Sequence, residues 1–187
     1  SNLCFEDKYG VFEVGMSKAG EIRDLAKLIK PHIGIITNIG EAHIENFKNI
    51  KGIAEAKAEI IESIKENGTL LINRDDKFYN YLNKKAKLKK LKVVSFGISR
   101  KSDIFPLKIV KGKSFTKLSL QVINEKIDLE IKNINIHNVL ASLAVIKTLN
   151  LKLKKIKNIF KNLEASAGRG KIHIISRYKK RFKLIDE

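Results

Sequence analysis

The stretch ITNIGEAHIENF, residues 36–47, places a histidine between two acidic residues directly after an apolar run. Carboxylate oxygens are natural ligands for Mg²⁺, and imidazole is a less usual ligand for this ion. Glu13, in the segment VFEVG, also lies at the end of a predicted strand, so Glu13 and His43 form a candidate metal-binding pair. The structural alternative is that Glu13 is a solvated or capping residue and that His43 is a turn residue.

Lys57 is the second residue whose position suggests chemistry. In the predicted helix 51–66, an apolar face is defined by Ile53, Ile60, Ile61 and Ile64. Lys57 lies on this face, four residues after Ile53. One interpretation is snorkelling, in which the aliphatic stem is buried and the ammonium reaches water. The other is that burial lowers the pKa of the amine and makes it reactive as a neutral group.

The order of the predicted elements indicates what positions these residues. Apolar runs of strand length alternate with amphipathic segments of helix length, which is typical of a parallel sheet flanked by helices. The predicted strands are 11–15, 32–38, 69–73 and 92–97, and the predicted helices between them are 20–30 and 51–66. Ligands of such sheets bind outside the carboxyl ends of the strands. Glu13, residues 37–43 and residues 73–76 all lie at predicted strand ends.

A different pattern covers residues 103–131, where short alternations of polar and apolar residues predict an antiparallel excursion. Further predicted elements are helices at 136–150 and 154–164, a Gly-rich turn at 167–170 and a strand that begins at 182. We therefore expect an α/β fold, with a mostly parallel sheet flanked by helices and a small antiparallel β excursion around 103–131.

Composition limits the class of protein. With 187 residues, 43% of them hydrophobic, the chain can form a domain with a core. It has no apolar run of about 18 residues and no signal-peptide pattern at its start, and its single cysteine, Cys4, excludes an internal disulfide, so we expect a cytoplasmic location. The net charge of +18 would suit nucleic acid, but the lysines are scattered and lack interleaved aromatic residues. We therefore expect neither nucleic-acid nor membrane binding.

Seven segments occur in the order seen in the central ATP-binding domain of Mur ligases, and the chain resembles that domain over essentially its whole length. The segments are FEVGMSKAGEI, KPHIGIITNIGEAHIENF, AEAKAEII, LLINRDD, NIHNVLASLAV, AGRG and LIDE. The GEI sequence and the NIGEAH spacing look most like the ligase type that adds D-alanyl-D-alanine to UDP-N-acetylmuramoyl-tripeptide. Related ligases such as folylpolyglutamate synthetase and cyanophycin synthetase remain alternatives.

The resemblance implies roles for individual residues in binding Mg²⁺. Glu13 and His43 would hold one ion. Lys57 would be carbamylated by carbon dioxide, and the resulting anion would support a second ion. A carbamate would also explain why a lysine lies on an apolar face.

The resemblance also implies a site for ATP. Asn138, in the HN pair that begins a predicted helix, would contact the adenine, with His137 beside it. Asp186 would bind the ribose hydroxyls, and Asn73 would lie near the nucleotide. Arg169 would reach the γ-phosphate and stabilise charge during transfer, so Lys57 and Arg169 are the predicted catalytic residues.

The reaction implied is phosphorylation of a substrate carboxylate by ATP to an acyl phosphate, followed by attack of the D-alanyl-D-alanine amine. The expected partners are the small-molecule substrates ATP, UDP-N-acetylmuramoyl-tripeptide and D-alanyl-D-alanine, and the protein is expected to be a monomer. Neither step requires a nucleophilic Ser or Cys.

Departures from the family pattern qualify this interpretation. The only GKS sequence, 112–114, has Leu107 where the G-x-x-x-x-G-K-[ST] phosphate loop requires Gly, so we interpret it as a hairpin turn. Ala167 stands where the family usually has Pro before the GR pair. We expect residues 1–187 to be part of a central domain without the phosphate loop or the flanking domains, and to be inactive alone. A non-catalytic remnant with weak nucleotide or partner binding is the alternative, and a basic nucleic-acid binder is a third hypothesis.

Overall fold

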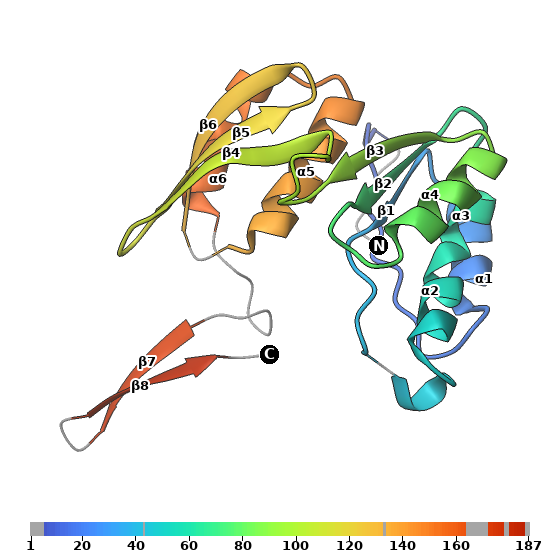
Figure 1. The fold of residues 1–187 in the computed structure, drawn as a ribbon, viewed down its shortest axis with the longest axis horizontal. Coiled ribbons are helices and arrows are strands. Elements are labelled where there is room, and N and C mark those ends of the chain that lie inside the picture. The colour runs from blue at the N-terminus through green and yellow to red at the C-terminus, as the bar shows by residue number, and fades with distance from the viewer. Residues whose placement is uncertain (1–5, 43, 133, 164–171, 178–179, 186–187) are drawn as a thin grey trace.

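The computed structural model describes residues 6–42, 44–132, 134–163, 172–177 and 180–185. The described strands form a sheet of six and a separate pair (Figure 1). The larger sheet has the order β1 (Ile33–Ile36), β2 (Thr69–Asn73), β3 (Lys92–Phe96), β4 (Ile104–Lys111), β5 (Thr116–Val122) and β6 (Glu125–Ile131). The smaller sheet pairs β7 (Ile172–Arg177) with β8 (Lys180–Ile185) in antiparallel register.

Strand directions in the six-stranded sheet confirm the expected fold class. β1, β2 and β3 pair in parallel, whereas β4, β5 and β6 pair antiparallel over the predicted excursion. The two halves meet at one parallel pair of residues, Phe96 and Ile104. The predicted hairpin turn is also confirmed, because the Gly112 amide donates to the Phe115 carbonyl between β4 and β5.

Helices cover both faces of the parallel strands. The α-helices are α1 (Glu21–Ile29), α2 (Ile50–Ala58), α3 (Ile60–Ser63), α4 (Tyr79–Leu88), α5 (Ile136–Thr148) and α6 (Lys157–Asn162), and the 3-10 helices are η1 (Ile44–Asn46) and η2 (Leu153–Lys155). One hydrophobic core joins α5 to the antiparallel strands, and a second joins α2, α3 and α4 to β1 and β2. Among the described residues, every helix is too short or too polar to span a bilayer.

Strand β2 explains how one sheet serves two cores. Successive side chains of a strand point to opposite faces. Leu71 therefore joins the core that contains α5, while Leu70 and Ile72 join the core that contains α2 and α4. All five residues of β2 are buried, as its continuous apolar sequence predicts for a strand covered on both faces. Its structural bounds coincide with the predicted bounds of 69–73.

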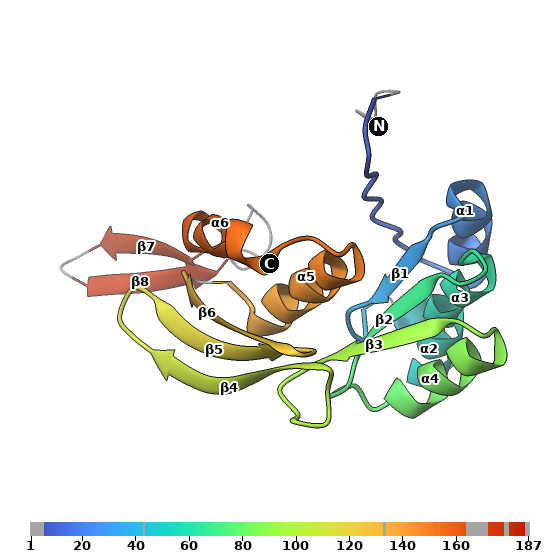
Figure 2. The same ribbon diagram turned by 90° about the horizontal axis from the view of Figure 1, so that it is seen from above.

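The predicted strand at residues 11–15 is wrong. The structure has an extended segment there, which joins no ladder with any described strand. Val11 is 95% exposed, and Figure 2 shows the segment leading away from the sheet. Without a neighbouring strand, the backbone groups have no ladder partners and the alternating side chains have no core to enter.

Two helix predictions also need correction. The predicted helix 51–66 is divided into α2 and α3 at Glu59, whose amide bonds to the Ala56 carbonyl three residues earlier. It ends at Ser63, because Ile64 adopts an extended conformation.

Helix α4 was not predicted. Its buried residues, Tyr79, Leu82 and Ala86, are few and stand among lysines, which obscures the helical periodicity.

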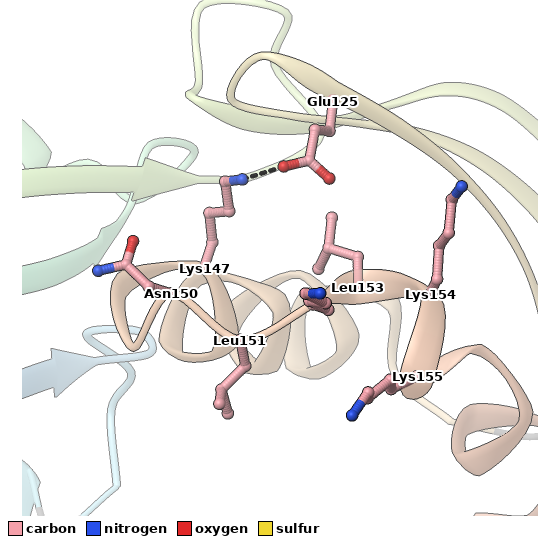
Figure 3. A pocket seen from close by; sticks show the side chains of 8 residues that line it. Glu125, Lys147, Asn150, Leu151, Leu153, Lys154 and Lys155 are labelled. Carbon is pink, nitrogen blue, oxygen red and sulfur yellow. Dashed lines mark hydrogen bonds and ion pairs between the residues drawn. The ribbon is translucent and has the colours of Figure 1, made fainter.

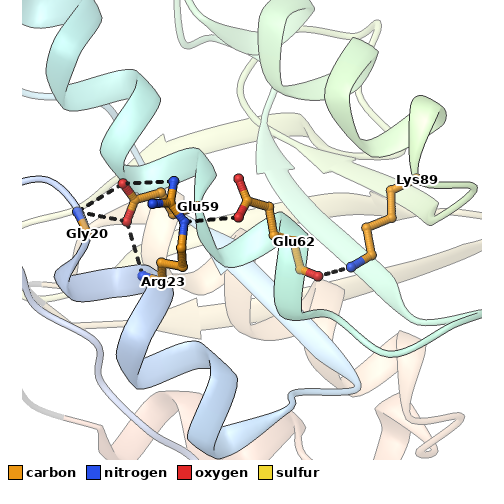
Figure 4. Close-up of polar contacts among 5 residues, drawn as sticks. All are labelled: Gly20, Arg23, Glu59, Glu62 and Lys89. Atoms are coloured by element: carbon orange, nitrogen blue, oxygen red, sulfur yellow. Dashed lines mark hydrogen bonds and ion pairs between the residues drawn. The ribbon is translucent and has the colours of Figure 1, made fainter.

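The junction between α2 and α3 holds the start of α1. Gly20 is the N-cap of α1 and provides no side chain, so the amides of the first turn need another acceptor. Glu59 supplies it, accepting hydrogen bonds from the Gly20 amide at 3.0 and 3.1 Å and from the Arg23 amide at 3.1 Å (Figure 4). The Glu59 side chain is only 7% exposed, and its carboxylate lies 3.6 Å from the Arg23 guanidinium. This carboxylate therefore caps a helix that is distant in sequence, and its negative charge interacts favourably with the positive end of the helix dipole.

We predict that Glu59→Ala lowers the free energy of unfolding by about 1–3 kcal/mol, because it leaves the partly buried amides of Gly20 and Arg23 without an acceptor. Urea unfolding followed by circular dichroism measures this loss. Glu55→Ala is the control, since Glu55 is exposed and its surface ion pair with Lys51, at 3.9 Å, contributes less than about 1 kcal/mol. Equal losses in the two variants would contradict the capping role.

Candidate functional site

The loops at the carboxyl ends of β1, β2 and β3 are tied together by two acidic residues. Asp75 and Asp76 follow β2 after one intervening residue, Arg74, and their carboxylates accept backbone hydrogen bonds from the loops after β1 and β3. Parallel strands end at the same edge of a sheet, which is where open α/β folds bind ligands. The predicted location of the site is therefore the edge that these two carboxylates organise.

Asp76 connects the loop after β1 to the turn before α4. Its carboxylate accepts the Ile39 amide at 2.6 Å and the Phe78 amide at 2.8 Å. Lys57 reaches the same loop from α2, and its Nζ donates to the Asn38 carbonyl at 2.9 Å. The lysine on the apolar face of the helix thus points its amine at the carboxyl end of β1.

The pKa of Lys57 lies below that of an ordinary lysine. Partial burial of the ammonium lowers the pKa, and attraction to the Asp76 carboxylate raises it by a smaller amount. A larger fraction of Lys57 is therefore neutral at a given pH than of a solvated lysine. This is the local condition that the reactive-amine interpretation requires, while carbamylation itself stays a prediction.

Asp75 connects β2 to the loop after β3 and to α5. It accepts the Ile98 amide at 2.5 Å and the Ser99 amide at 3.0 Å. Its Oδ2 also lies 3.0 Å from Nε2 of His137. Gly97 makes room for this arrangement, because a Cβ there would lie 2.7 Å from the same carboxylate oxygen.

The charged form of Asp75 is favoured overall. Partial burial raises the pKa of its carboxyl, but the hydrogen bonds from Ile98, Ser99 and His137 lower it by more, so the pKa lies below its usual range. The carboxylate thus stabilises the fold fully at a pH above the usual Asp pKa, and this contribution is lost as the pH falls through the lowered pKa.

His137 and Asn138 lie in the first turn of α5. Asn135 is the N-cap of this helix, and its side chain accepts the His137 amide at 2.8 Å. The Asn138 amide donates to the Asn135 carbonyl, and Asn138 itself is exposed. The structure therefore leaves Asn138 accessible while the ring of His137 faces Asp75.

Asn73, the last residue of β2, is buried and has a structural contact. Its Oδ1 accepts the Asp75 amide at 2.9 Å, which forms the turn that places the two acids. Its predicted proximity to a nucleotide stays a prediction.

The predicted metal ligands are only partly within the described part of the chain. Glu13 lies in the extended segment before α1 and is exposed. His43, Arg169 and Asp186 lie outside the described residues. Among the residues that are described, no group of three or more His, Cys, Asp or Glu side chains could hold a metal ion. The magnesium site therefore stays a prediction.

Two hollows in the surface are lined by other residues. One, of about 280 Å³, lies at the C-terminal end of α5 and contains the Lys147–Glu125 ion pair and the side chains of Lys154 and Lys155 (Figure 3). His137 is the second residue of the same helix and Lys147 follows ten residues later, so the hollow begins about 15 Å from His137 along the helix axis. The other, of about 870 Å³, is lined by residues of α1 to α4 and of the stretch before α2, including Glu59 and Tyr81. Neither contains a predicted nucleotide or metal ligand.

Sequence reasoning placed residues 73–76 at a strand end but assigned no role to Asp75 or Asp76. Two adjacent acids one residue beyond a predicted buried strand were the available signal, because such side chains can bind the exposed amides of neighbouring loops. The pairing of Asp75 with His137, 62 positions apart, has no signal in a single sequence.

Three curated proteins that are similar to this chain carry the same enzyme name. The Buchnera aphidicola (Baizongia pistaciae) UDP-N-acetylmuramoyl-tripeptide--D-alanyl-D-alanine ligase is 30% identical over 95% of this chain and 39% of its own length. The corresponding ligase of Rickettsia prowazekii is 32% identical over 92% and 39%, and that of Escherichia coli K12 is 31% identical over 89% and 37%. The chain thus spans well under half the length of these relatives.

Solved structures give the same fold. Crystal structure I of MurF from Acinetobacter baumannii superposes with a TM-score of 0.85 at 27% identity, over 98% of this chain and 40% of that one. The MurF ligase of Thermotoga maritima, in a complex with ADP, gives a TM-score of 0.73 at 24% identity over 84% and 36%, which supports the fold alone. A sequence profile for the Mur ligase middle domain matches residues 3–149. The chain therefore belongs to the Mur ligase family.

Proposed function

We propose that the chain supplies the nucleotide-binding part of an ATP-dependent ligase that joins D-alanyl-D-alanine to UDP-N-acetylmuramoyl-tripeptide in peptidoglycan synthesis. The relatives that match over nine-tenths of the chain carry the name of this activity. A cytoplasmic location fits this proposal, because ATP is a cytoplasmic substrate.

The observation that carries the proposal is the environment of Lys57. Its amine is half-buried, has a lowered pKa and is directed at the loop after β1, which the resemblance associates with metal binding. A lysine used only for solubility would keep its ammonium in water. The neutral amine can instead add to carbon dioxide, forming an N–C bond and releasing a proton, to give a carbamate.

A carbamate at Lys57 would change the sign of the charge beside the loop after β1. It would provide two oxygens as ligands of the kind that Mg²⁺ accepts. Glu13 and His43 complete the proposed metal ligands. When bound, the ion would supply charge neutralisation for the phosphates.

The proposed nucleotide-binding residues are Asn138, His137, Asn73, Asp186 and Arg169. Asn138 supports the assignment by being exposed in the first turn of α5, on the helix whose start is fixed to the strand ends. The T. maritima ligase, which shares the fold, was solved in complex with ADP. Arg169 would stabilise the charge that develops as the phosphoryl group leaves ATP.

A hybrid ligase tests the proposed function. Residues 1–187 would replace the matching 37% of the E. coli ligase. We expect this hybrid to turn over ATP continuously only when UDP-N-acetylmuramoyl-tripeptide and D-alanyl-D-alanine are both present, and to form the joined product, detected by mass spectrometry. A hybrid that folds and binds these substrates but forms no product would contradict the proposal.

We predict that the amine of Lys57 forms a carbamate in the 187-residue chain. In ¹³C-bicarbonate with magnesium, the wild-type chain should give a carbamate carbon signal that is lost in Lys57→Ala. Lys51→Ala is the control, since Lys51 is exposed on the same helix and should leave the signal unchanged. Chelation of magnesium should weaken the signal by removing the ion that stabilises the carbamate.

The same substitution has a functional readout. In the hybrid ligase, Lys57→Ala should remove most of the activity, and small added carboxylates should restore part of it. A wild-type level of activity in Lys57→Ala would favour the snorkelling interpretation.

We predict that Arg169→Lys does not preserve turnover. Lysine keeps the charge but loses the planar group that can bind two phosphate oxygens at once. The expected loss in kcat of the hybrid ligase is about 10²-fold or more. Arg100→Lys, at an exposed loop position, should turn over normally. If Arg169→Lys also turned over normally, a diffuse positive charge would be sufficient.

A further inference from the structure

Asp75 is the one described side chain that bonds to the loop after β3 and to the start of α5 together. Oδ1 accepts the Ser99 amide at 3.0 Å, and Oδ2 accepts the Ile98 amide at 2.5 Å while lying 3.0 Å from Nε2 of His137. Its own backbone amide is held by the side chain of Asn73 at 2.9 Å. The backbone of Asp75 is therefore held by Asn73 and its carboxylate by the loop after β3, independently of the contact with α5.

The contact with His137 holds the first turn of α5 as well as the imidazole ring. His137 is the second residue of α5, so a bond from its ring to the end of β2 orients the whole first turn of that helix. Asn138 is the next residue, and its amide and that of Val139 both bond to the Asn135 carbonyl, at 3.1 and 3.2 Å. A shift of the His137 ring would displace the exposed side chain of Asn138 with it.

The same contact uses the nitrogen of His137 that would otherwise be available to a ligand. With Nε2 committed to Asp75, a nucleotide base would have to approach His137 by the ring face or by Nδ1. Asn138 has its side chain exposed and is better placed to make a direct contact.

We infer that Asp75 is a positioning residue of the nucleotide site, which acts through His137 to hold Asn138 in place without touching the nucleotide. The inference rests on the proposed function in taking Asn138 to be the adenine ligand. It assigns His137 to the support of the site rather than to direct recognition.

Local capping does not account for this contact. Asn135 already caps α5 by accepting the His137 amide, so the helix start has its acceptor without Asp75. The Asp75 carboxylate instead joins residues that are 62 positions apart and sets where the capped helix lies relative to the sheet. Glycine at position 97, where a Cβ would lie 2.7 Å from Asp75 Oδ2, keeps the space for it.

The first experiment is ADP binding to the 187-residue chain, measured by isothermal titration. Asp75→Asn should weaken binding about tenfold, the size expected for the loss of one charge-assisted hydrogen bond. Asp103→Asn is the matched control, because Asp103 also bridges strand ends, accepting the Ser95 amide at 2.7 Å and the Ser95 hydroxyl at 2.6 Å. It should leave the affinity unchanged, since Asp103 has no described contact with α5.

Variants of His137 separate positioning from direct recognition. His137→Gln places an amide donor near the position of Nε2 and should keep the affinity within about threefold of wild type, whereas His137→Ala should match Asp75→Asn. The double variant Asp75→Asn/His137→Ala should lose no more than either single variant, because both remove one interaction. If His137→Gln lost as much affinity for ADP as His137→Ala while Asp75→Asn bound ADP normally, the inference would be overturned in favour of a direct contact by His137.

A second measurement does not depend on the nucleotide. Amide hydrogen exchange at Asn138 and Val139 should be at least about fivefold faster in Asp75→Asn than in Asp103→Asn, because the first turn of α5 loses its anchor. Equal exchange in the two variants would overturn the inference even if ADP binds. If the wild-type chain did not bind ADP but exchange rose as expected, the anchoring of α5 would stand and the proposed nucleotide site would fail.

Discussion

The fold around the candidate site depends on how the loop amides after the parallel strands are satisfied. These amides lie beyond the last ladder hydrogen bonds, and unpaired backbone groups that leave water are costly. Asp75 and Asp76 supply acceptors for four of them, in the loops after β1 and β3 and in the turn after β2. Two consecutive side chains at the end of the central strand of the parallel group therefore fix the loops on either side of it.

This constraint also determines the chemistry available to Lys57. Asp76 is close enough to raise the pKa of the lysine, yet its two oxygens already accept the amides of Ile39 and Phe78. The net pKa of Lys57 is still lowered, because burial is the larger effect. Asp76 offsets the effect of burial only in part, so the amine of Lys57 is neutral more often than that of a solvated lysine.

The parts of the fold that the sequence predicted are those set by short-range patterns. A run of five apolar or uncharged buried residues gave the bounds of β2, and polar-apolar alternation gave the antiparallel strands after Asp103. Segment 11–15 has the composition of a strand but no described neighbour, since composition does not specify a partner. Helix α4 was not evident because lysines separate its few buried residues, and the contacts that the Glu59 side chain makes with α1 join residues 36 to 39 positions apart.

The same distinction applies to the candidate site. The position of Lys57 on an apolar face could be derived from helical spacing, and the side chain is partly buried in the structure. The interactions of Asp75 with Ile98 and His137 could not be derived from the sequence, because they join three elements that meet only in the folded chain. Roles that came from the resemblance alone, including those of Arg169 and Asp186, stay predictions.

Two acids beside a proposed triphosphate site raise an electrostatic question, since like charges at close range repel. Their hydrogen bonds provide the answer. Asp75 is surrounded by two backbone amides and His137, and Asp76 by two amides, with Lys57 close by. Donors around each carboxylate oppose its field, so the negative charge presented to a ligand is smaller than the two formal charges suggest. The acids can thus lie at the edge of the sheet that is proposed to bind nucleotide, because the donors that fix the loops also oppose the field of the carboxylates that hold them.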